Sequence, residues 1–178
     1  MRSFEFAMKD NEKAYTEAQL PEYATEHSAG ADFFCAEEVT VPSLWKSLAS
    51  QLFSFKTDIN LISDNKKLFQ PTLVHTGIKA SMETDEVLEL YNRSSNPKKL
   101  GLILANSVGV VDADYYSNPD NDGEIMFAFY NFMPFDITLK VGDKVGQGVF
   151  KKFLRPTKGL NVKSVKREGG FGSTDSNN

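Results

Sequence analysis

The chain has 178 residues, a formal net charge of −4, two histidines and a single cysteine. This length is enough for one domain whose core needs no disulfide or structural metal. The negative charge argues against a nucleic acid as the main partner, because binding to a polyanion depends on a basic surface. No segment could span a membrane, and the lone Cys35 with no signal-like N-terminal segment favours the cytoplasm.

Short runs of aromatic and β-branched residues, separated by Gly, Pro, Asn and Asp, predict an all-β domain rather than alternating strands and helices. In the first run, residues 4–8, large apolar side chains alternate with Glu5 and Ala7 as in a strand with one buried face. The same reasoning predicts further strands at residues 87–91, 102–105, 125–132 and 145–150.

One segment departs from this pattern. The apolar residues of segment 43–55 recur at helical spacing after Pro42, which predicts an amphipathic helix. These residues are Leu44, Trp45, Leu48, Leu52 and Phe55. The C-terminal residues 166–178 are rich in Gly and polar residues and are expected to hold no regular structure by themselves.

Two internal groups have chemistry suited to phosphate or metal. Asp112 and Asp114 follow a β-branched run, so both would point to one side of an extended strand and suit a hydrated cation or a general base. Arg93, Ser94 and Ser95 offer planar donors and hydroxyls for phosphate. Taken singly, the aspartates are better explained as a solvated strand end, and the Arg-Ser-Ser group is a weak signal.

A third group lies near the C-terminus. Phe171 stands between glycines, after Lys166 and Arg167 and before Ser173 and Thr174. Its ring could stack on a base, and the cations and hydroxyls around it suit phosphate. By composition alone, a disordered tail is the simpler explanation.

Two other kinds of catalytic site are unsupported. His27, His75 and Cys35 lie far apart and have no zinc-ligand spacing, so both histidines are interpreted as surface or packing residues. No Gly-x-Ser-x-Gly sequence supports a serine hydrolase, so hydrolysis is expected to use water directly.

Order and spacing carry more weight than any single group. Five segments resemble, in sequence, the five motifs of the trimeric dUTPase family, and the third is the most specific of them. They are residues 29–33 (Ala-Gly-Ala-Asp-Phe), 93–95 (Arg-Ser-Ser), 109–115 (Gly-Val-Val-Asp-Ala-Asp-Tyr), 142–147 (Gly-Asp-Lys-Val-Gly-Gln) and 169–174 (Gly-Gly-Phe-Gly-Ser-Thr).

The resemblance implies an all-β, jelly-roll-like barrel that assembles as a homotrimer, with each active site built from more than one chain. Residues 1–165 would form the β domain, residues of about 43–73 an insertion with the helix, and 166–178 a flexible arm closing over a neighbour's site. Such an insertion is typical of divergent phage-type members, which would place the protein in a host cytoplasm.

The resemblance also implies hydrolysis of dUTP to dUMP and pyrophosphate. Asp112 would be the general base for the water that attacks the α-phosphorus. Mg²⁺ would lie on the phosphates, with Asp32 holding its water shell. A β-hairpin would read the uracil with the help of Asn106, and Tyr115 would exclude a ribose 2′-hydroxyl.

The remaining substrate contacts follow from the same match. Ser94 and Gln147 would lie on the phosphate side, and Phe171 would stack on the uracil. The full set of further substrate-binding residues is Arg93, Ser94, Ser95, Gly109, Gln147, Lys166, Arg167, Phe171, Gly172, Ser173 and Thr174.

Several positions depart from the family pattern. Either Lys166 or Arg167 could replace the usual arginine of the fifth motif, and Asp175 stands where a glycine is usual. The loop after Tyr115 is longer than usual, which makes Tyr116 an alternative sugar gate. The insertion could either pack on its own subunit, which its amphipathic pattern favours, or bind a protein partner or cap the site.

Two rival functions share these features. A dCTP deaminase needs a catalytic glutamate at the position of Ala128, so the sequence lacks the catalytic residue that this function requires. A nucleotide-sensing regulatory protein could retain the dUTP site and contact a partner through the insertion or the arm. Release of pyrophosphate from dUTP separates the enzyme from such a sensor.

Overall fold

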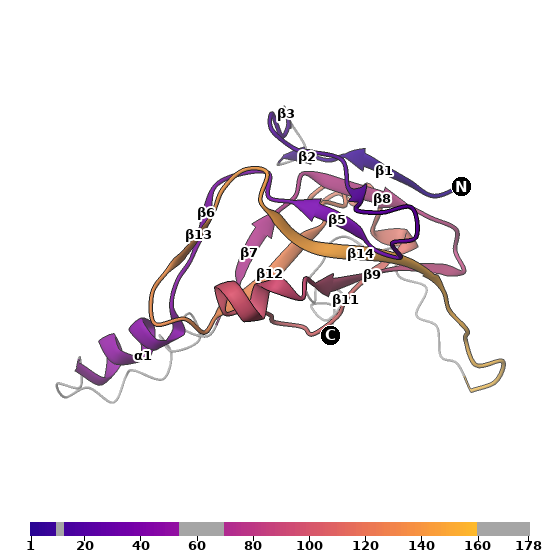
Figure 1. The fold of residues 1–178 in the computed structure, drawn as a ribbon. Helices are drawn as coiled ribbons and strands as arrows, with labels where there is room; N and C mark the ends of the chain where they lie inside the picture. Colours follow the sequence, from indigo (N-terminus) through magenta and orange to yellow (C-terminus); the bar gives the residue numbers. More distant parts are fainter. Residues whose placement is uncertain (10–12, 54–69, 160–178) are drawn as a thin grey trace.

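The computed structural model describes residues 1–9, 13–53 and 70–159, which form a mostly β fold with a few short helices (Figure 1). The strands are β1 Ser3–Phe6, β2 Met8–Lys9, β3 Lys13–Ala14, β4 Glu22–Tyr23, β5 Ala31–Phe34, β6 Val39–Val41, β7 Thr72–His75, β8 Ile78–Ser81, β9 Glu86–Asn92, β10 Leu102–Leu104, β11 Gly109–Asp112, β12 Met126–Asn131, β13 Ile137–Leu139 and β14 Lys144–Lys152. The helices are α1 Leu44–Phe53, a π-helical turn η1 Asn96–Leu100 and a 3₁₀ turn η2 Ala113–Tyr115.

A five-stranded antiparallel sheet forms the centre of the molecule, in the order β11-β9-β14-β5-β4. Its longest ladder joins β9 and β14, from the pair Asn92 and Gly146 to the pair Glu86 and Lys152. In Figure 1, β14 crosses the middle of the molecule beside β9 and β5. The sheet therefore brings segments around residues 32, 92, 112 and 147 onto neighbouring strands.

A three-stranded sheet, β10-β12-β7, supplies the other side of the core. Phe127 and Phe129 of β12 are buried, and the Phe127 ring centroid lies 5.7 Å from that of Phe33 in β5. Packing of buried faces from two sheets through large aromatic side chains is the architecture of β-sandwiches and jelly rolls.

The ladder places two glycines against this aromatic core. A Cβ atom at Gly146 would lie 1.9 Å from Cε1 of Phe127, and one at Gly148 would lie 2.6 Å from Cε2 of Phe33. Only glycine therefore allows β14 to approach these rings so closely.

The strand predicted over residues 4–8 is confirmed as β1 and β2 except at Ala7, where it is interrupted. β1 ends at Phe6, and Ala7 is fully buried, with its N–H donating to the Gly77 carbonyl at 2.9 Å. Phe6 and Met8 are exposed instead. The small side chain fits where the N-terminal segment crosses the turn before β8, a constraint that the local sequence pattern does not contain. The four other predicted strands are confirmed as β9, β10, β12 and β14.

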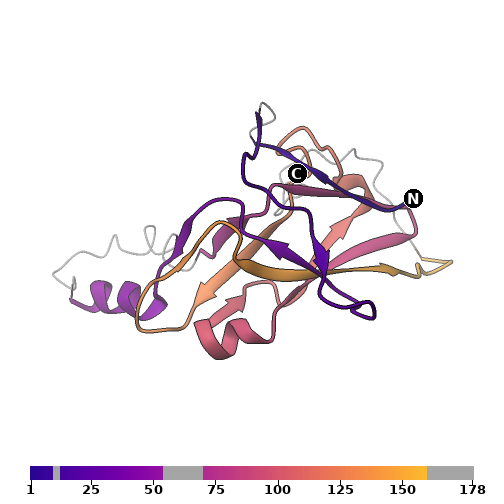
Figure 2. The ribbon, with the colours of Figure 1, turned by 45° about the horizontal axis from the view of Figure 1, so that its top comes forward.

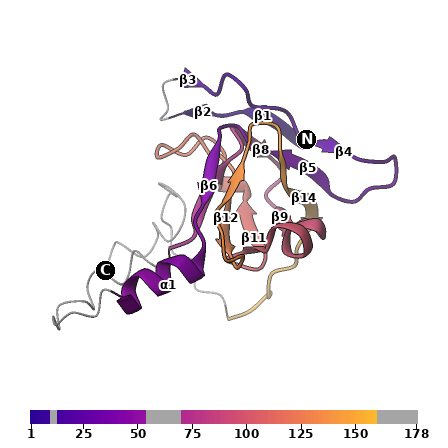
Figure 3. The ribbon, with the colours of Figure 1, turned by 60° about the vertical axis from the view of Figure 1, so that its left-hand side comes forward.

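The predicted helix is confirmed as α1, and Ser43 caps its start. The Lys46 N–H donates to Ser43 Oγ at 3.3 Å, and that hydroxyl donates to the Met133 carbonyl at 2.6 Å. The Trp45 indole donates to the Phe132 carbonyl at 2.9 Å. All three views show α1 at one end of the molecule, beyond the paired strands β6 and β13 (Figures 1, 2 and 3).

The first turns of α1 are thus attached to their own subunit. An apolar pocket of about 400 Å³ remains between α1 and β12. It is lined by Leu44, Trp45, Leu48, Tyr130 and Phe132. Residues 54–69 of the predicted insertion lie outside the described residues, so its capping or partner-binding role stays a prediction. None of the helices in the described ranges is long and apolar enough to cross a membrane.

Gly146→Ala tests the close approach of β14 to the core. Because the added methyl group would overlap the Phe127 ring, we expect the free energy of unfolding to fall by about 3 kcal/mol. Urea denaturation of the single variant and of the double variant with Phe127→Leu measures this loss. The smaller side chain should remove part of the overlap, so additive losses would contradict the explanation.

Candidate active site

A buried carboxylate lies at the junction of three strands. Asp32 in β5 is 3% exposed, and its register partner on β14 is Gln147. The Gln147 amide donates to Asp32 Oδ1 at 2.9 Å, and Lys144 Nζ donates to Oδ2 at 2.9 Å. Arg93 Nε lies 3.7 Å from Oδ1. These four residues, the Asp32 cluster, unite the segments of the first, second and fourth motifs.

The partners of Asp32 decide its charge. Burial raises the pKa of this carboxyl, but hydrogen bonds from Lys144 and Gln147, with the charge of Arg93 nearby, lower it by more. Its pKa therefore lies below the ordinary 3.8, and the group is ionised at neutral pH. Within the described ranges, no group of three or more His, Cys, Asp or Glu residues could hold a metal ion.

The Arg-Ser-Ser segment follows the end of β9 and is fixed over β14. The Arg93 guanidinium donates to the Lys144 carbonyl at 3.3 Å. The buried Asn96 amide donates to the Val145 carbonyl at 2.8 Å and closes the turn around the two serines. Ser94 is exposed and Ser95 is half-buried, so the turn presents hydroxyls beside a guanidinium at the surface.

A small pocket of about 70 Å³, here called the Tyr115 pocket, lies between β9, β11 and the start of β12. It is lined by Leu90, Asn106, Val111, Tyr115, Glu124, Ile125 and Met126. Gly109 allows β11 to lie close to β9 there, because a Cβ atom at this position would be 3.0 Å from Cβ of Leu90. Asn106 and Tyr115, two predicted nucleoside contacts, therefore share one pocket.

The predicted β-hairpin around Asn106 is not a paired ladder. β10 pairs with β12, whereas β11 pairs with β9, so the turn containing Asn106 connects two sheets. Ser107 in this turn has a φ of 61°, and the Val108 N–H donates to the Asn106 carbonyl at 2.6 Å. The turn is closed by local hydrogen bonds, and the sequence alone did not distinguish this geometry from a hairpin.

The two tyrosines in succession point to different surroundings. The Tyr115 hydroxyl donates to the Glu124 carbonyl at 3.1 Å and accepts from Asn121 Nδ2 at 2.9 Å. The Tyr116 hydroxyl donates to Glu5 at 2.7 Å, and Lys79 Nζ lies 5.1 Å from the centre of its ring. Tyr115 lines the pocket described above and Tyr116 does not.

Asp112 and Asp114 do not lie in one extended strand as predicted. Asp112 is the last residue of β11, and Asp114 belongs to the 3₁₀ turn η2 that follows. Both still line a common cleft of about 400 Å³, which also contains Glu86 and Arg155. The 3₁₀ turn η2 interrupts the strand after Asp112, and Tyr115 at its end is buried.

The Asp32 cluster and Asp112 lie at opposite ends of β9. Arg93 follows the last residue of this strand, whereas Asp112 pairs with Val87 near its start. Six residues of extended chain separate these positions by about 20 Å. The residues of the predicted site therefore lie at two separate places on one subunit.

The lone cysteine is unsuited to covalent catalysis. Cys35 is fully buried, and burial raises the pKa of its thiol to about 11. The predicted contacts of the arm, Lys166, Arg167, Phe171, Gly172, Ser173 and Thr174, lie outside the described residues.

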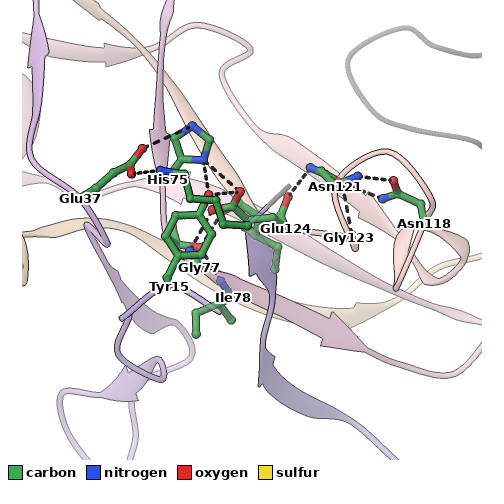
Figure 4. A network of polar contacts seen from close by, with 12 residues as sticks. Tyr15, Glu37, His75, Gly77, Ile78, Asn118, Asn121, Gly123 and Glu124 are labelled. Carbon is green, nitrogen blue, oxygen red and sulfur yellow. Dashed lines mark hydrogen bonds and ion pairs between the residues drawn. The ribbon is translucent and has the colours of Figure 1, made fainter. Parts of the chain in front are cut away.

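Sequence reasoning missed a polar network that reaches the Tyr115 pocket through Glu124. Figure 4 shows this network. Glu124, His75 and Tyr15 form it, although His75 was interpreted as a surface or packing residue. These residues are far apart in the chain and match no motif. The one local sequence signal for this network was Glu124, a glutamate directly after the long loop that follows the third motif.

Comparison with known proteins identifies the family. A sequence profile described as dUTPase matches residues 58–175. The deoxyuridine 5′-triphosphate nucleotidohydrolase of Lactococcus lactis is 40% identical over 158 residues, which are 87% of each chain. The chain belongs to the dUTPase family. Its activity is that of a dUTP diphosphatase, as predicted. The alternative of a dCTP deaminase requires a catalytic glutamate at the position of Ala128 in β12.

Solved structures agree with the fold prediction. The crystal structure of dUTPase from Streptococcus mutans has a TM-score of 0.66 and 35% identity, covering 88% of this chain and 99% of that one. A dUTPase from phage phi11 of S. aureus has a TM-score of 0.61 at 17% identity, which shows the dUTPase fold alone. These bacterial relatives are more similar in sequence than this phage protein, so the similarity gives the predicted phage-type origin no support.

Asp32→Asn tests the ionised state of the Asp32 cluster. Since the substitution removes charge-assisted hydrogen bonds, we expect a loss of about 2 kcal/mol in the free energy of unfolding. The pKa of Asp32 is lowered on folding, so the loss should be equal at pH 7 and pH 5 and should shrink below pH 3.8. Urea denaturation at each pH measures it.

Asp85→Asn is the matched control, because Asp85 forms an exposed ion pair with Lys152. Exposed pairs contribute little, so this variant should be close to the unsubstituted protein. Equal losses for the two variants would contradict the importance assigned to Asp32.

Proposed function

We propose that the chain hydrolyses dUTP at a site completed by a second subunit of a homotrimer. One subunit would supply the Tyr115 pocket and Asp112, and its neighbour the Asp32 cluster with Ser94 and Ser95. The observation that carries this proposal is the separation of about 20 Å along β9 between Arg93 and Asp112. The α-phosphate is attached directly to the sugar, so one nucleotide cannot reach both ends of β9 in the same subunit.

The Tyr115 pocket is the proposed nucleoside site. Its apolar walls, Leu90, Val111 and Ile125, suit a flat base, and the exposed Asn106 side chain and turn backbone can hydrogen-bond its edge. Tyr115 is held by two hydrogen bonds at its hydroxyl, which fixes the ring as a steric barrier to a 2′-hydroxyl.

Asp112 is the proposed general base. It accepts a proton from a water molecule as the water oxygen attacks the α-phosphorus, and pyrophosphate leaves with the electrons of the broken P–O bond. An ionised aspartate is a weak base, so most of the acceleration comes from positioning the water and neutralising the triphosphate. Arg93, Ser94 and Gln147 are suited to the second task.

Mg²⁺ fits this assignment as a metal carried by the substrate. Asp32 is ionised, but both of its oxygens already accept hydrogen bonds, and the described residues contain no group of three or more His, Cys, Asp or Glu side chains that could hold a metal ion. The carboxylate can accept a hydrogen bond from a metal-bound water, whereas the phosphates would bind the ion directly. The ion would neutralise charge on the triphosphate.

Complementation between two inactive variants tests the shared site. Asp112→Asn and Arg93→Ala should each release pyrophosphate from dUTP orders of magnitude more slowly, the first without loss of nucleotide affinity. After unfolding and joint refolding, random trimers should recover about a quarter of the normal activity, because a quarter of the sites receive both intact parts. No recovery in mixed trimers would contradict the proposal.

Tyr115→Phe and Tyr116→Phe form a matched pair for the sugar gate. Removal of the Tyr115 hydroxyl frees the ring from Glu124 and Asn121, so we expect the preference for dUTP over UTP in kcat/KM to fall about tenfold. Tyr116→Phe loses the hydrogen bond to Glu5, outside the Tyr115 pocket, and should keep the preference. The reverse result would assign the gate to Tyr116.

A further inference from the structure

Glu124 lines the Tyr115 pocket and also holds the residue that closes it. Its backbone carbonyl accepts the hydrogen bond of the Tyr115 hydroxyl at 3.1 Å and one from Asn121 Nδ2 at 3.3 Å. The Glu124 N–H donates to the Asn121 carbonyl at 3.0 Å. The peptide groups of this residue therefore fix both Tyr115 and the end of its loop.

The Glu124 side chain contacts a second set of partners, which Figure 4 shows. It is 4% exposed, and its two oxygens contact three residues from two segments of the chain. The Gly77 N–H donates to Oε1 at 3.0 Å, the Tyr15 hydroxyl donates to Oε2 at 2.8 Å, and His75 Nδ1 lies 2.9 Å from Oε2. This carboxylate ties the loop to β7, to the turn before β8 and to the N-terminal segment.

The backbone beside Glu124 has little room to absorb a displacement. Gly123 has a φ of +79°, and a Cβ atom there would lie 2.7 Å from both Ser117 N and the Tyr115 carbonyl oxygen. The segment is therefore packed directly against the backbone of the loop it closes. A change in the position of the Glu124 side chain is expected to move the carbonyl that binds Tyr115.

We propose that Glu124 is the positioning residue of the sugar gate, and that His75 makes this positioning dependent on pH. The inference rests on the assignment of Tyr115 as the sugar gate. Glu124 acts through Tyr115 and does not itself need to touch the substrate.

The surroundings of His75 account for the pH dependence. The hydrogen bond to Glu124 raises the pKa of the imidazole above its ordinary 6.5, and burial opposes this. Glu37, 3.9 Å from Nε2, raises the pKa further, whereas Lys9, paired with Glu37, lowers it. Among the described residues, Tyr15 is a further titratable group in contact with the ring.

The raised pKa of His75 sets the direction in which pH changes the pairing with Glu124. Below pH 6.5 the imidazolium is present and pairs with the buried Glu124 carboxylate. As the pH rises above 6.5 and through the folded-state pKa, this stabilising charge is lost. A neutral imidazole with its proton on Nδ1 still offers a donor, so deprotonation removes the charge while a hydrogen bond can remain.

Loss of the His75 charge is expected to change the preference of the enzyme for dUTP over UTP. A less firmly held Tyr115 is a weaker barrier to a ribose, so we expect the preference for dUTP over UTP to fall as the pH rises through the His75 transition. The triphosphates of dUTP and UTP titrate alike, so their ionisation cancels in the ratio of kcat/KM values. Asp112 lines a different cleft from the Tyr115 pocket, so kcat for dUTP should follow another pH profile.

His75→Asn and Glu124→Gln test the proposal in the full-length enzyme. Asn can keep a donor at the place of Nδ1, and Gln can keep an acceptor for Gly77, but each removes one charge of the pair. The ratio of kcat/KM for dUTP to that for UTP is measured from pH 5.5 to 8.5. We expect it to fall up to about tenfold in the unsubstituted enzyme and to stay flat in both variants.

Asp136→Asn provides the control, because its exposed ion pair with Lys46 has the same 2.9 Å distance but lies beside α1. It should keep the pH-dependent ratio. An unchanged pH profile in folded His75→Asn would overturn the proposal, even if Glu124→Gln did not fold.

Tyr115→Phe separates failure of this inference from failure of the proposed gate. If Tyr115→Phe lowers the preference for dUTP but His75→Asn keeps the normal pH profile, only the role of the network is wrong. If Tyr115→Phe leaves the preference intact, the assignment of the gate itself is wrong.

Discussion

The ladder between β9 and β14 is the constraint on which the rest of the molecule depends. It runs from Asn92 opposite Gly146 to Glu86 opposite Lys152, and both of its strands gain a second neighbour in the central sheet. β5 adds Asp32 on one side, and β11 adds Asp112 on the other. The ladder can form only because β14 carries glycine where the rings of Phe127 and Phe33 press against its backbone. A hydrophobic packing requirement thereby sets the positions of the polar groups.

The surroundings of this ladder differ in charge and burial along its length. At one end, several donors surround one buried carboxylate, which keeps Asp32 ionised while the Arg93 guanidinium remains near the surface. Beside β11, a pocket with apolar walls is closed by a tyrosine whose hydroxyl is bound to a backbone carbonyl. The first environment suits phosphate and the second suits a nucleoside. The separation of Arg93 and Asp112 along β9 is the physical reason why a second subunit is needed in the proposed mechanism.

The sequence predicted the strands and the helix well where a local period existed, and it failed where a distant segment decided the outcome. Residues 4–8 alternate in sequence, yet Ala7 is the buried one because the chain there crosses Gly77. The family resemblance implies a hairpin at Asn106, yet β10 and β11 belong to different sheets. His75 matches no catalytic pattern, and only the folded chain brings it to Glu124.

By itself, the sequence determined the family and the activity, since five ordered motifs specify the residue types that a dUTP site requires. It also determined which residues compete for each role, such as Tyr115 and Tyr116. Tertiary structure alone decided their surroundings: Tyr115 lines a pocket, whereas Tyr116 contacts Glu5 and Lys79. The reason is that side-chain direction and burial depend on strands paired across long sequence separations. A motif records which groups are present, and the sheet determines what each of them touches.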